Sequence, residues 1–356
     1  MKFTKLAKAS AFVLAAVATF GASAASNGIT VSITPAKAVL QSNDDVLVTV
    51  KMTNNSGVDQ LVLKSGTPFG SNPDALFEVV RDGVAVDYQG RITKRVAPTA
   101  ADYFTLKAGK SYSQTVELSA LYDMSQTGNY SIRYNFHSEH AFAGGNQGLV
   151  AGGNAGELTS GNVSMWINGH SNGAKVSPAP SLQALAASLS YTNCSSSRQS
   201  LISTAYGSAK TYASNALSYL NAGTKGARYT TWFGTYDATR YSTVKSHFSK
   251  ISNAYATQAF VVDCSCTDSG TYAYVYPNQP YKIYVCGAFW SAPNTGTDSK
   301  AGTLVHESSH FTVLGGTADN AYGQTAAKSL AKSSPAKAIM NADSHEYFAE
   351  NNPFQN

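Results

Sequence analysis

Charged residues and long apolar runs are scarce in this chain of 356 residues. Asp, Glu, Lys and Arg together make up 13% of it, the formal net charge is +5, and no basic run is interleaved with aromatic residues. Nucleic-acid binding relies on such a basic surface, so it has no support here. After residue 24 no apolar run is long enough to cross a bilayer, and we therefore expect no membrane span.

Cysteine is also rare, and the N-terminal half contains none. Its absence there excludes an inhibitory cysteine switch in that half and the inter-sheet disulfide of antibody domains. The C-terminal half has no C-x-x-C pair, which disfavours a zinc site made of cysteines. Four cysteines allow three disulfide pairings, and a Cys264–Cys266 bridge would be strained because these residues are two apart. The four residues are Cys194, Cys264, Cys266 and Cys286.

Residues 1–24 have the three parts of a secretory signal peptide. Lysines at positions 2, 5 and 8 precede an apolar stretch from Ala9 to Phe20, and Ala22-Ser23-Ala24 offers a cleavage site made of small residues. An exported protein reaches an oxidising compartment, in which cysteines form disulfides. We therefore expect a secreted, extracellular protein.

The length suggests about two domains, and the two halves differ in pattern. Residues 25–167 contain short segments in which apolar and polar residues alternate, as β-strands do. The segments Phe77–Val80 and Val84–Val86, separated by Arg81-Asp82-Gly83, predict a hairpin with a D-G turn. Repeated short strands with turns between them predict an all-β immunoglobulin-like sandwich. Residues 168–180, rich in Gly, Ser and Asn and with two prolines, predict a linker.

Residues 181–356 combine helical patterns with short strands, which predicts an α+β domain and makes the whole chain multidomain. Strands are expected at residues 259–262, 272–276 and 282–285. The edge strand of such a sheet can hold an extended peptide through backbone hydrogen bonds.

The most informative pattern is His306-Glu307-Ser308-Ser309-His310. Residues four apart share one face of a helix, so both imidazoles can reach one ion. The glutamate can then act on a metal-bound water, as in the H-E-x-x-H arrangement of zinc metallopeptidases. The alternative is a surface helix on which both histidines are simply polar positions. Thr297 or Asp298 would cap the helix, and Gly315-Gly316 would end it.

A zinc site of this kind also needs a third protein ligand and an open position for water. Asp319 is the nearest candidate, because it lies just after the Gly315-Gly316 turn, and Tyr322 follows it closely. Glu346 and Glu350, which share one predicted helical face, are the alternatives.

H-E-x-x-H followed by G-T-x-D-x-x-Y-G resembles the aspzincins, the family of deuterolysin and peptidyl-Lys metalloendopeptidase. The similarity runs from about Tyr191 to the end and implies a zincin-like metallopeptidase domain at residues 181–356. The overall size and the added N-terminal half most resemble secreted aspzincin exotoxins of the Aeromonas type. The resemblance also implies the disulfides Cys194–Cys264 and Cys266–Cys286.

The same resemblance implies a role for each residue of the two motifs. It implies one Zn²⁺ per chain, held by His306, His310 and Asp319. It implies Glu307 as the general base for a zinc-activated water, and Tyr322 as a donor to the oxyanion.

A pair of acidic residues near the C-terminus suggests the specificity. Asp343 and Glu346 are three apart, so on a helix they face the same way, and two converging carboxylates would attract a lysine side chain. The alternative is two solvated acids on a helix surface. The resemblance implies that these two residues line the pocket for the residue after the cut, and hence cleavage on the amino side of lysine.

Two hypotheses describe the N-terminal half. In the first it is a propeptide at residues 25–167 that blocks the cleft as an intramolecular inhibitor and is removed by cleavage or autocleavage, with Ala174–Lys175 in the linker as a candidate site. In the second it is a permanent binding module, and the protein could then be a secreted binding protein or adhesin. The first leads us to expect a monomeric zinc endopeptidase that is made as a preproenzyme and acts on proteins or peptides.

Overall fold

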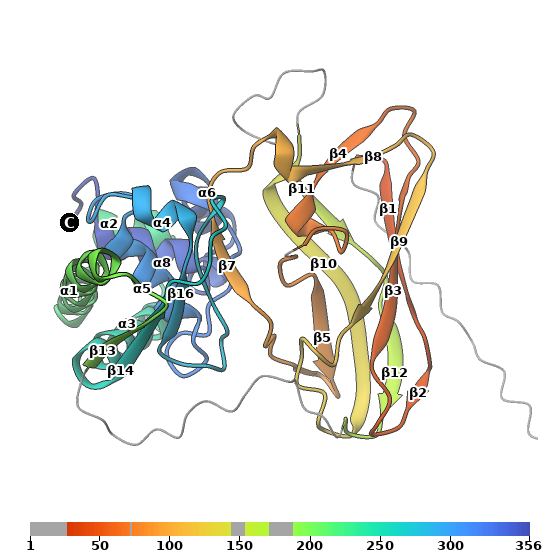
Figure 1. Cartoon of the computed structure of the whole chain (residues 1–356), viewed down its shortest axis with the longest axis horizontal. Helices are drawn as coiled ribbons and strands as arrows, with labels where there is room; N and C mark the ends of the chain where they lie inside the picture. The colour runs from red at the N-terminus through yellow and green to blue at the C-terminus, as the bar shows by residue number, and fades with distance from the viewer. Residues whose placement is uncertain (1–26, 72, 144–153, 171–187) are drawn as a thin grey trace, which may run out of the picture.

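The computed structural model describes residues 27–71, 73–143, 154–170 and 188–356. Within them two separate hydrophobic cores form, one from residues 29–167 and the other from residues 202–349. Figure 1 shows the two parts side by side, the β-rich N-terminal part on the right and the part with both helices and strands on the left. The expected signal peptide and the candidate cleavage site Ala174–Lys175 lie outside the described residues.

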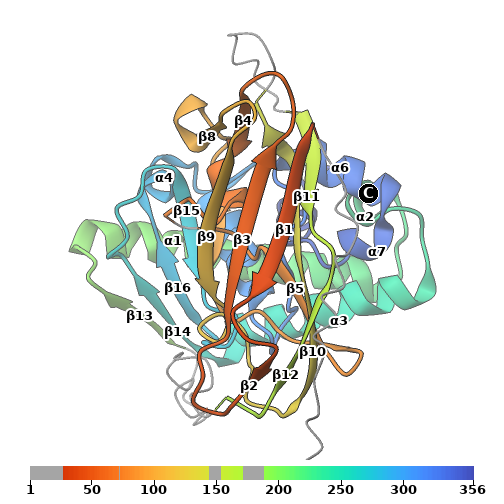
Figure 2. The same ribbon diagram turned by 90° about the vertical axis from the view of Figure 1, so that its right-hand side faces the viewer.

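Two β-sheets form most of the N-terminal part. The elements are β1 (Ile29–Pro35), β2 (Val39–Leu40), β3 (Leu47–Asn54), β4 (Gln60–Leu63), η1 (Lys64–Gly66), β5 (Phe77–Arg81), β6 (Val84–Ala85), η2 (Ala100–Asp102), β8 (Tyr103–Leu106), β9 (Ser111–Glu117), β10 (Gly128–Phe142), β11 (Asn154–Thr159) and β12 (Val163–Ile167). One sheet has the order β1-β3-β9 and faces the viewer in Figure 2. The other has the order β2-β12-β10-β4-β8, with β5 and β11 also paired to β10. Val48 and Val50 of β3 share a buried core with Tyr130 and Ile132 of β10, so the two sheets pack on each other.

The D-G hairpin in this part is confirmed. Strands β5 and β6 pair antiparallel, with Val80 opposite Ala85. Asp82 and Gly83 form the connection with φ values of 48° and 86°, the left-handed conformation that a two-residue hairpin turn requires.

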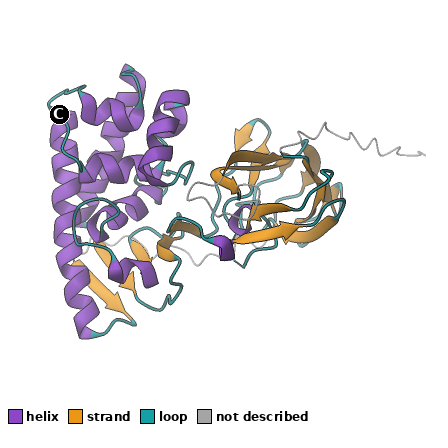
Figure 3. Cartoon of the chain, turned by 90° about the horizontal axis from the view of Figure 1, so that it is seen from above, coloured by secondary structure: helices purple, strands orange, loops and turns teal. Residues whose placement is uncertain are grey.

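Helices dominate the C-terminal part, as the purple ribbons of Figure 3 show. Its elements are β13 (Ser188–Thr192), α1 (Ser196–Asn221), α2 (Ala227–Phe233), α3 (Ala238–Thr257), β14 (Ala259–Asp263), β15 (Thr271–Val275), β16 (Lys282–Val285), α4 (Gly287–Ser291), α5 (Lys300–His310), α6 (Gly323–Ser333), α7 (Pro335–Ala338) and α8 (Ala342–Glu350). Strands β13, β14 and β16 are parallel neighbours, and β15 joins them antiparallel. The expected strands at 259–262, 272–276 and 282–285 are thus confirmed to within one residue at each end.

One strand of the N-terminal half leaves its own sheets. Strand β7 (Ile92–Arg95) pairs antiparallel with β15 and completes the order β13-β14-β16-β15-β7. In its register Lys94 lies opposite Ala273, and Thr93 lies opposite Tyr274. Figure 1 shows this orange strand against the helical part, away from the rest of the red-to-yellow chain. The edge strand expected to hold a peptide therefore holds a segment of the same chain.

Helix α5 carries the H-E-x-x-H residues and is buried along its whole length. The expected cap at Thr297 or Asp298 was wrong, because Ser299 is the N-cap and its hydroxyl accepts a hydrogen bond from the Gly302 N–H at 2.9 Å. The helix also ends earlier than Gly315. The carbonyl of Phe311 accepts hydrogen bonds from the N–H groups of residues 314, 315 and 316, which folds the chain into a turn directly after His310.

Two disulfides are present in the C-terminal part, Cys194–Cys264 and Cys266–Cys286, with the pairing that the resemblance implies. Among the described residues, the helices are all too short or too polar to cross a membrane.

Candidate active site

The two motif histidines and Asp319 converge on one point. Nε2 of His306 and Nε2 of His310 lie 3.2 and 3.4 Å from Oδ1 of Asp319. Both imidazoles are fully buried, and none of the three atoms makes a well-formed hydrogen bond within the described residues. Two imidazole nitrogens and a carboxylate oxygen are a donor set that suits zinc, so the residues present fit this ion.

The loop after α5 brings Asp319 into place. The Thr317 N–H donates to the carbonyl of Ser309 at 3.1 Å, which folds the loop back along the helix end. The side-chain oxygen of Asn341 then accepts from the N–H groups of Asn320 and Ala321, at 2.9 Å each. The loop is therefore fixed on both sides of Asp319.

The outer nitrogens of the two histidines are also held. Nδ1 of His310 donates to the carbonyl of Thr317 at 2.8 Å. Nδ1 of His306 lies 2.8 Å from Oδ1 of Asp343 and 3.2 Å from Oε2 of Glu346. Partners of this kind fix the orientation of an imidazole, so that its other nitrogen can face a metal.

The alternative third ligands occupy other places. Glu346 lies on the Nδ1 side of His306, where the cluster of possible ligand atoms contains His306, Asp343 and Glu346 but lacks His310. Glu350 instead accepts hydrogen bonds from the N–H and hydroxyl of Ser299 at 2.9 and 2.7 Å. Burial, followed by the charge of Glu346, raises the pKa of Glu350 to about 9, so this side chain is protonated at neutral pH. The geometry therefore favours Asp319.

Glu307 is fully buried beside the two histidines. Neither of its carboxylate oxygens has a hydrogen-bond partner among the described residues, which leaves both able to accept a proton from a water held at the site. Burial raises the pKa of Glu307 to about 7. A pKa close to neutrality is what a general base needs in order both to take and to release a proton.

Tyr322 lies on the opposite side of Asp319. Its hydroxyl is 3.0 Å from Oδ2 of Asp319 and 3.1 Å from the carbonyl oxygen of Thr93 in strand β7. The phenol thus lies close to both the candidate metal site and a backbone carbonyl of strand β7.

The two acids near the C-terminus do face the same way on α8, and both are buried. Nζ of Lys94 lies 2.7 Å from Oε2 of Glu346 and 3.6 Å from Oδ1 of Asp343. Burial opposes the charge of Lys94, but the neighbouring carboxylates outweigh it and hold the pKa of the ammonium well above its usual value. Burial raises the pKa of Glu346, whereas Lys94 and His306 overcome burial at Asp343 and lower its pKa. The two buried carboxylates of Asp343 and Glu346 thus lie next to the ammonium of Lys94.

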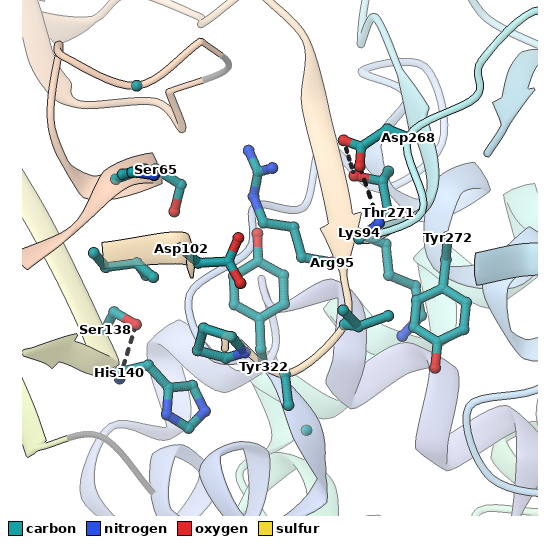
Figure 4. A pocket seen from close by; sticks show the side chains of 18 of the residues that line it. Ser65, Lys94, Arg95, Asp102, Ser138, His140, Asp268, Thr271, Tyr272 and Tyr322 are labelled. Carbon is teal, nitrogen blue, oxygen red and sulfur yellow. Dashed lines mark hydrogen bonds between the residues drawn. The ribbon is translucent and has the colours of Figure 1, made fainter. Parts of the chain in front are cut away.

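A cavity of about 410 Å³ lies where the two parts meet. Its lining includes Lys94 and Arg95 from the N-terminal half and Tyr272, Tyr322 and Asp343 from the C-terminal half. Figure 4 shows the Lys94 side chain beside the ring of Tyr272, with Arg95 and Tyr322 farther along the same wall.

Three residues near the site were not predicted from the sequence: Thr93 and Lys94, which β7 supplies, and Asp298. A lysine within a short strand is an ordinary pattern, and nothing in the segment Ile92-Thr93-Lys94-Arg95 points to a site 212 residues further along the chain, at His306. Asp298 was considered only as a helix cap, whereas its Oδ1 lies 3.5 Å from Nζ of Lys94.

Comparisons with known proteins place this chain in a family. The family profile Aspzincin_M35, described as lysine-specific metallo-endopeptidase, matches residues 218–350. An extracellular protease of Aeromonas hydrophila is 44% identical over 322 residues, which cover 88% of this chain and 90% of that protein. The chain belongs to the aspzincin family of zinc metalloendopeptidases.

Two further aspzincins show how the similarity is distributed. A peptidyl-Lys metalloendopeptidase of Grifola frondosa is 39% identical over 354 residues, covering 97% of this chain and 99% of the relative. The peptidyl-Lys metalloendopeptidase of Pleurotus ostreatus is 59% identical over 165 residues, covering 46% of this chain and 97% of the relative. Some aspzincins therefore match the whole of this chain, and another matches only about half of it.

Proposed function

We propose that this aspzincin hydrolyses peptide bonds with one zinc ion held by His306, His310 and Asp319. The observation that carries the proposal is the convergence of these three side chains beside a buried, unpaired Glu307. When bound there, zinc would act as a Lewis acid toward the substrate carbonyl and would make water more acidic.

The chain's own residues supply the remaining chemistry. Glu307 takes the proton from the attacking water and passes it to the leaving amine. The Tyr322 hydroxyl donates to the carbonyl oxygen as negative charge develops on it, a contact commonly worth about 3–4 kcal/mol in the transition state. The surrounding burial keeps bulk water away from both groups, which strengthens these interactions.

The proposed specificity is for lysine directly after the cleaved bond. Two relatives are named peptidyl-Lys metalloendopeptidases. In this chain Asp343 and Glu346 already enclose the ammonium of Lys94. The carbonyl of the preceding residue, Thr93, accepts a hydrogen bond from Tyr322, as the carbonyl of a bond about to be cut would. The Thr93–Lys94 peptide therefore lies where a substrate peptide would lie.

This substrate-like placement supports the propeptide hypothesis for residues 25–167, a half of the chain that we take to be an immunoglobulin-like sandwich. Strand β7 occupies the edge of β15 in antiparallel register, and Lys94 fills the pocket proposed for the substrate. While strand β7 and the side chain of Lys94 stay in place, a substrate cannot bind. The match of the Pleurotus relative to only about half of the chain is what a removable propeptide leads one to expect.

The N-terminal half also braces the inserted strand. Nη2 of Arg95 lies 3.1 Å from Oδ1 of Asp74, a residue of the same half. Both side chains are half-buried, and burial raises the pKa of Asp74 despite this neighbour. A strand fixed at Arg95 has less freedom to shift in the cleft, which suits an inhibitor better than a substrate.

Two observations support export of the protein. The Aeromonas relative is an extracellular protease, and the two disulfides fit an oxidising destination. We propose a secreted monomer made as a preproenzyme with a signal peptide at residues 1–24, followed by the propeptide, a linker at 168–180 and the peptidase domain at 181–356.

Expression of the full chain with and without Glu307→Gln tests this proposal. Intact mass and zinc content are recorded for both proteins, with Glu157→Gln, an exposed glutamate of the N-terminal half, as the control. We expect wild type and the control to mature to roughly the C-terminal half, while Glu307→Gln stays at full length with zinc bound. Wild-type protein without zinc would refute the metal site. Equal maturation of Glu307→Gln would refute self-processing, and a full-length wild type with peptidase activity would favour the permanent module.

A further inference from the structure

A third carboxylate faces the ammonium of Lys94. Oδ1 of Asp298 lies 3.5 Å from Nζ, compared with 2.7 Å for Glu346 and 3.6 Å for Asp343. Asp298 comes from the loop before α5, whereas the other two acids come from α8. Its side chain is 41% exposed, while those of the other two are at most 1% exposed. Asp298 therefore lies at the outer end of the pocket.

The two buried acids have a second task that Asp298 does not share. Asp343 and Glu346 both contact Nδ1 of His306 and so help to orient a candidate metal ligand. Among the described residues, Asp298 has Lys94 as its ion-pair partner. Of the three acids, Asp298 is thus the one that pairs with the lysine without also contacting a candidate metal ligand.

The position of Asp298 is fixed from two directions. Its backbone adopts φ of 49°, a left-handed conformation that few residues other than Gly, Asn and Asp accept easily. The hydroxyl of Tyr347, whose side chain is fully buried, donates to Oδ1 of Asp298 at 2.8 Å. This is the same oxygen that faces Nζ of Lys94. The carboxylate is therefore held in place instead of moving freely in solvent.

We propose that Asp298 is a third specificity-determining carboxylate for lysine, and that Tyr347 is the residue that positions it. This inference rests on the proposed lysine pocket. An ammonium carries a compact charge with three N–H donors, and three carboxylates surround that of Lys94. Glu346 accepts its hydrogen bond at 2.7 Å, and Asp298 and Asp343 lie at ion-pair distances of 3.5 and 3.6 Å. The ring of Tyr272, whose centroid is 5.2 Å from Nζ, forms a further wall beside the ammonium (Figure 4).

The test compares two peptides that differ only after the cleaved bond, one with lysine and one with norleucine, which has a similar chain but no ammonium. The active form recovered from the full chain is assayed as wild type and as Asp298→Asn. Asparagine tolerates the left-handed backbone and can still accept from Tyr347, so the substitution removes mainly the charge. We expect the lysine-to-norleucine ratio of kcat/KM to fall roughly 5-fold, chiefly through KM, as suits one partly exposed ion pair.

Two further variants separate a charge effect from structural damage. Asp268→Asn removes another carboxylate that lines the same cavity but bonds to Gly270 and Thr271, and it should leave the ratio unchanged. Tyr347→Phe keeps the ring and should lower the ratio in the same direction as Asp298→Asn. An unchanged ratio in Asp298→Asn, with wild type active on lysine peptides, would overturn the inference and leave the proposed function intact. A wild type without zinc-dependent cleavage would overturn the proposed function itself, and the inference with it.

Discussion

Asp319 and the two histidines of α5 meet because the chain turns immediately after His310. The predicted consequence is that Asp319→Ala loses bound zinc, since two imidazoles alone hold this ion less tightly than two imidazoles and a carboxylate. Zinc content after dialysis measures the effect.

The matched control is Glu350→Gln, because glutamine has the shape of the protonated carboxyl expected at this position and can still accept from Ser299. This variant should keep its zinc. Retention of zinc by Asp319→Ala together with its loss from Glu350→Gln would reverse the assignment of the third ligand.

The hydroxyl of Tyr322 is expected to act in catalysis and not in substrate binding. Tyr322→Phe removes a hydroxyl that reaches the Thr93 carbonyl, so it should lower kcat by about 10²- to 10³-fold with little change in KM. Steady-state kinetics on a lysine peptide measures both constants. A rise in KM with kcat unchanged would show that the phenol serves binding and not catalysis.

Strand β7 is the element that joins the two parts of the molecule, because it leaves the N-terminal sheets and pairs with β15. Lys94→Ala removes the cation that Glu346 and Asp343 enclose, and the strand should then leave the cleft more often. We expect the full chain to show higher activity on a lysine peptide before maturation than wild type does. Activity assayed immediately after purification, beside intact mass, checks this.

Arg133→Ala is a suitable control for this experiment. Arg133 also belongs to the N-terminal half, but its ion pair is with Glu78, and its side chain is 40% exposed. This variant should remain as inactive before maturation as wild type. A full chain that stays equally inactive with Lys94→Ala would mean that the β-rich N-terminal part blocks the cleft by its bulk and not through the lysine.

At the scale of the whole molecule, a buried pair of histidines predicts sensitivity to acid. Nδ1 of His345 donates to the carbonyl of Asn341 at 2.9 Å, and its Nε2 lies 3.1 Å from Nδ1 of His247. Burial lowers the pKa of His345 to about 3 and that of His247 to about 4. The unfolded chain, with histidine pKa values near 6.5, therefore binds more protons than the folded one between about pH 6.5 and pH 4.

This difference in bound protons decides whether acid stabilises or destabilises the fold. Because the unfolded state gains protons first, the free energy of unfolding should fall as the pH drops from about 6.5 toward 4, by at most ~1.4 kcal/mol per pH unit for each histidine. Urea unfolding at several pH values measures this slope. His247→Gln removes one of the two groups and should make the slope shallower, and an unchanged slope would place the acid sensitivity elsewhere.

Local patterns in the sequence were sufficient for several of the elements and for the zinc metalloendopeptidase class. Spacing of four between His306 and His310 predicted one helical face, and alternation and the D-G pair predicted the β5–β6 hairpin. The strands β14, β15 and β16 of the C-terminal part were predicted to within a residue, whereas β13 was not. These features depend on neighbours along the chain, which a sequence displays. The helix cap was misplaced by one or two residues because Thr297, Asp298 and Ser299 are all good caps, and only packing decides among them.

Only the tertiary structure decided which distant segments meet. Lys94 reaches Glu346, 252 residues away in sequence, and Asp298 turns its carboxylate to the same ammonium. No periodicity or motif encodes such contacts, because they depend on how β7 crosses from one core to the sheet of the other. The motifs of the sequence were therefore enough to identify a zinc metalloendopeptidase. The placement of β7 beside β15 and of Lys94 beside Glu346 needed the fold, since those contacts exist only when both parts are packed together.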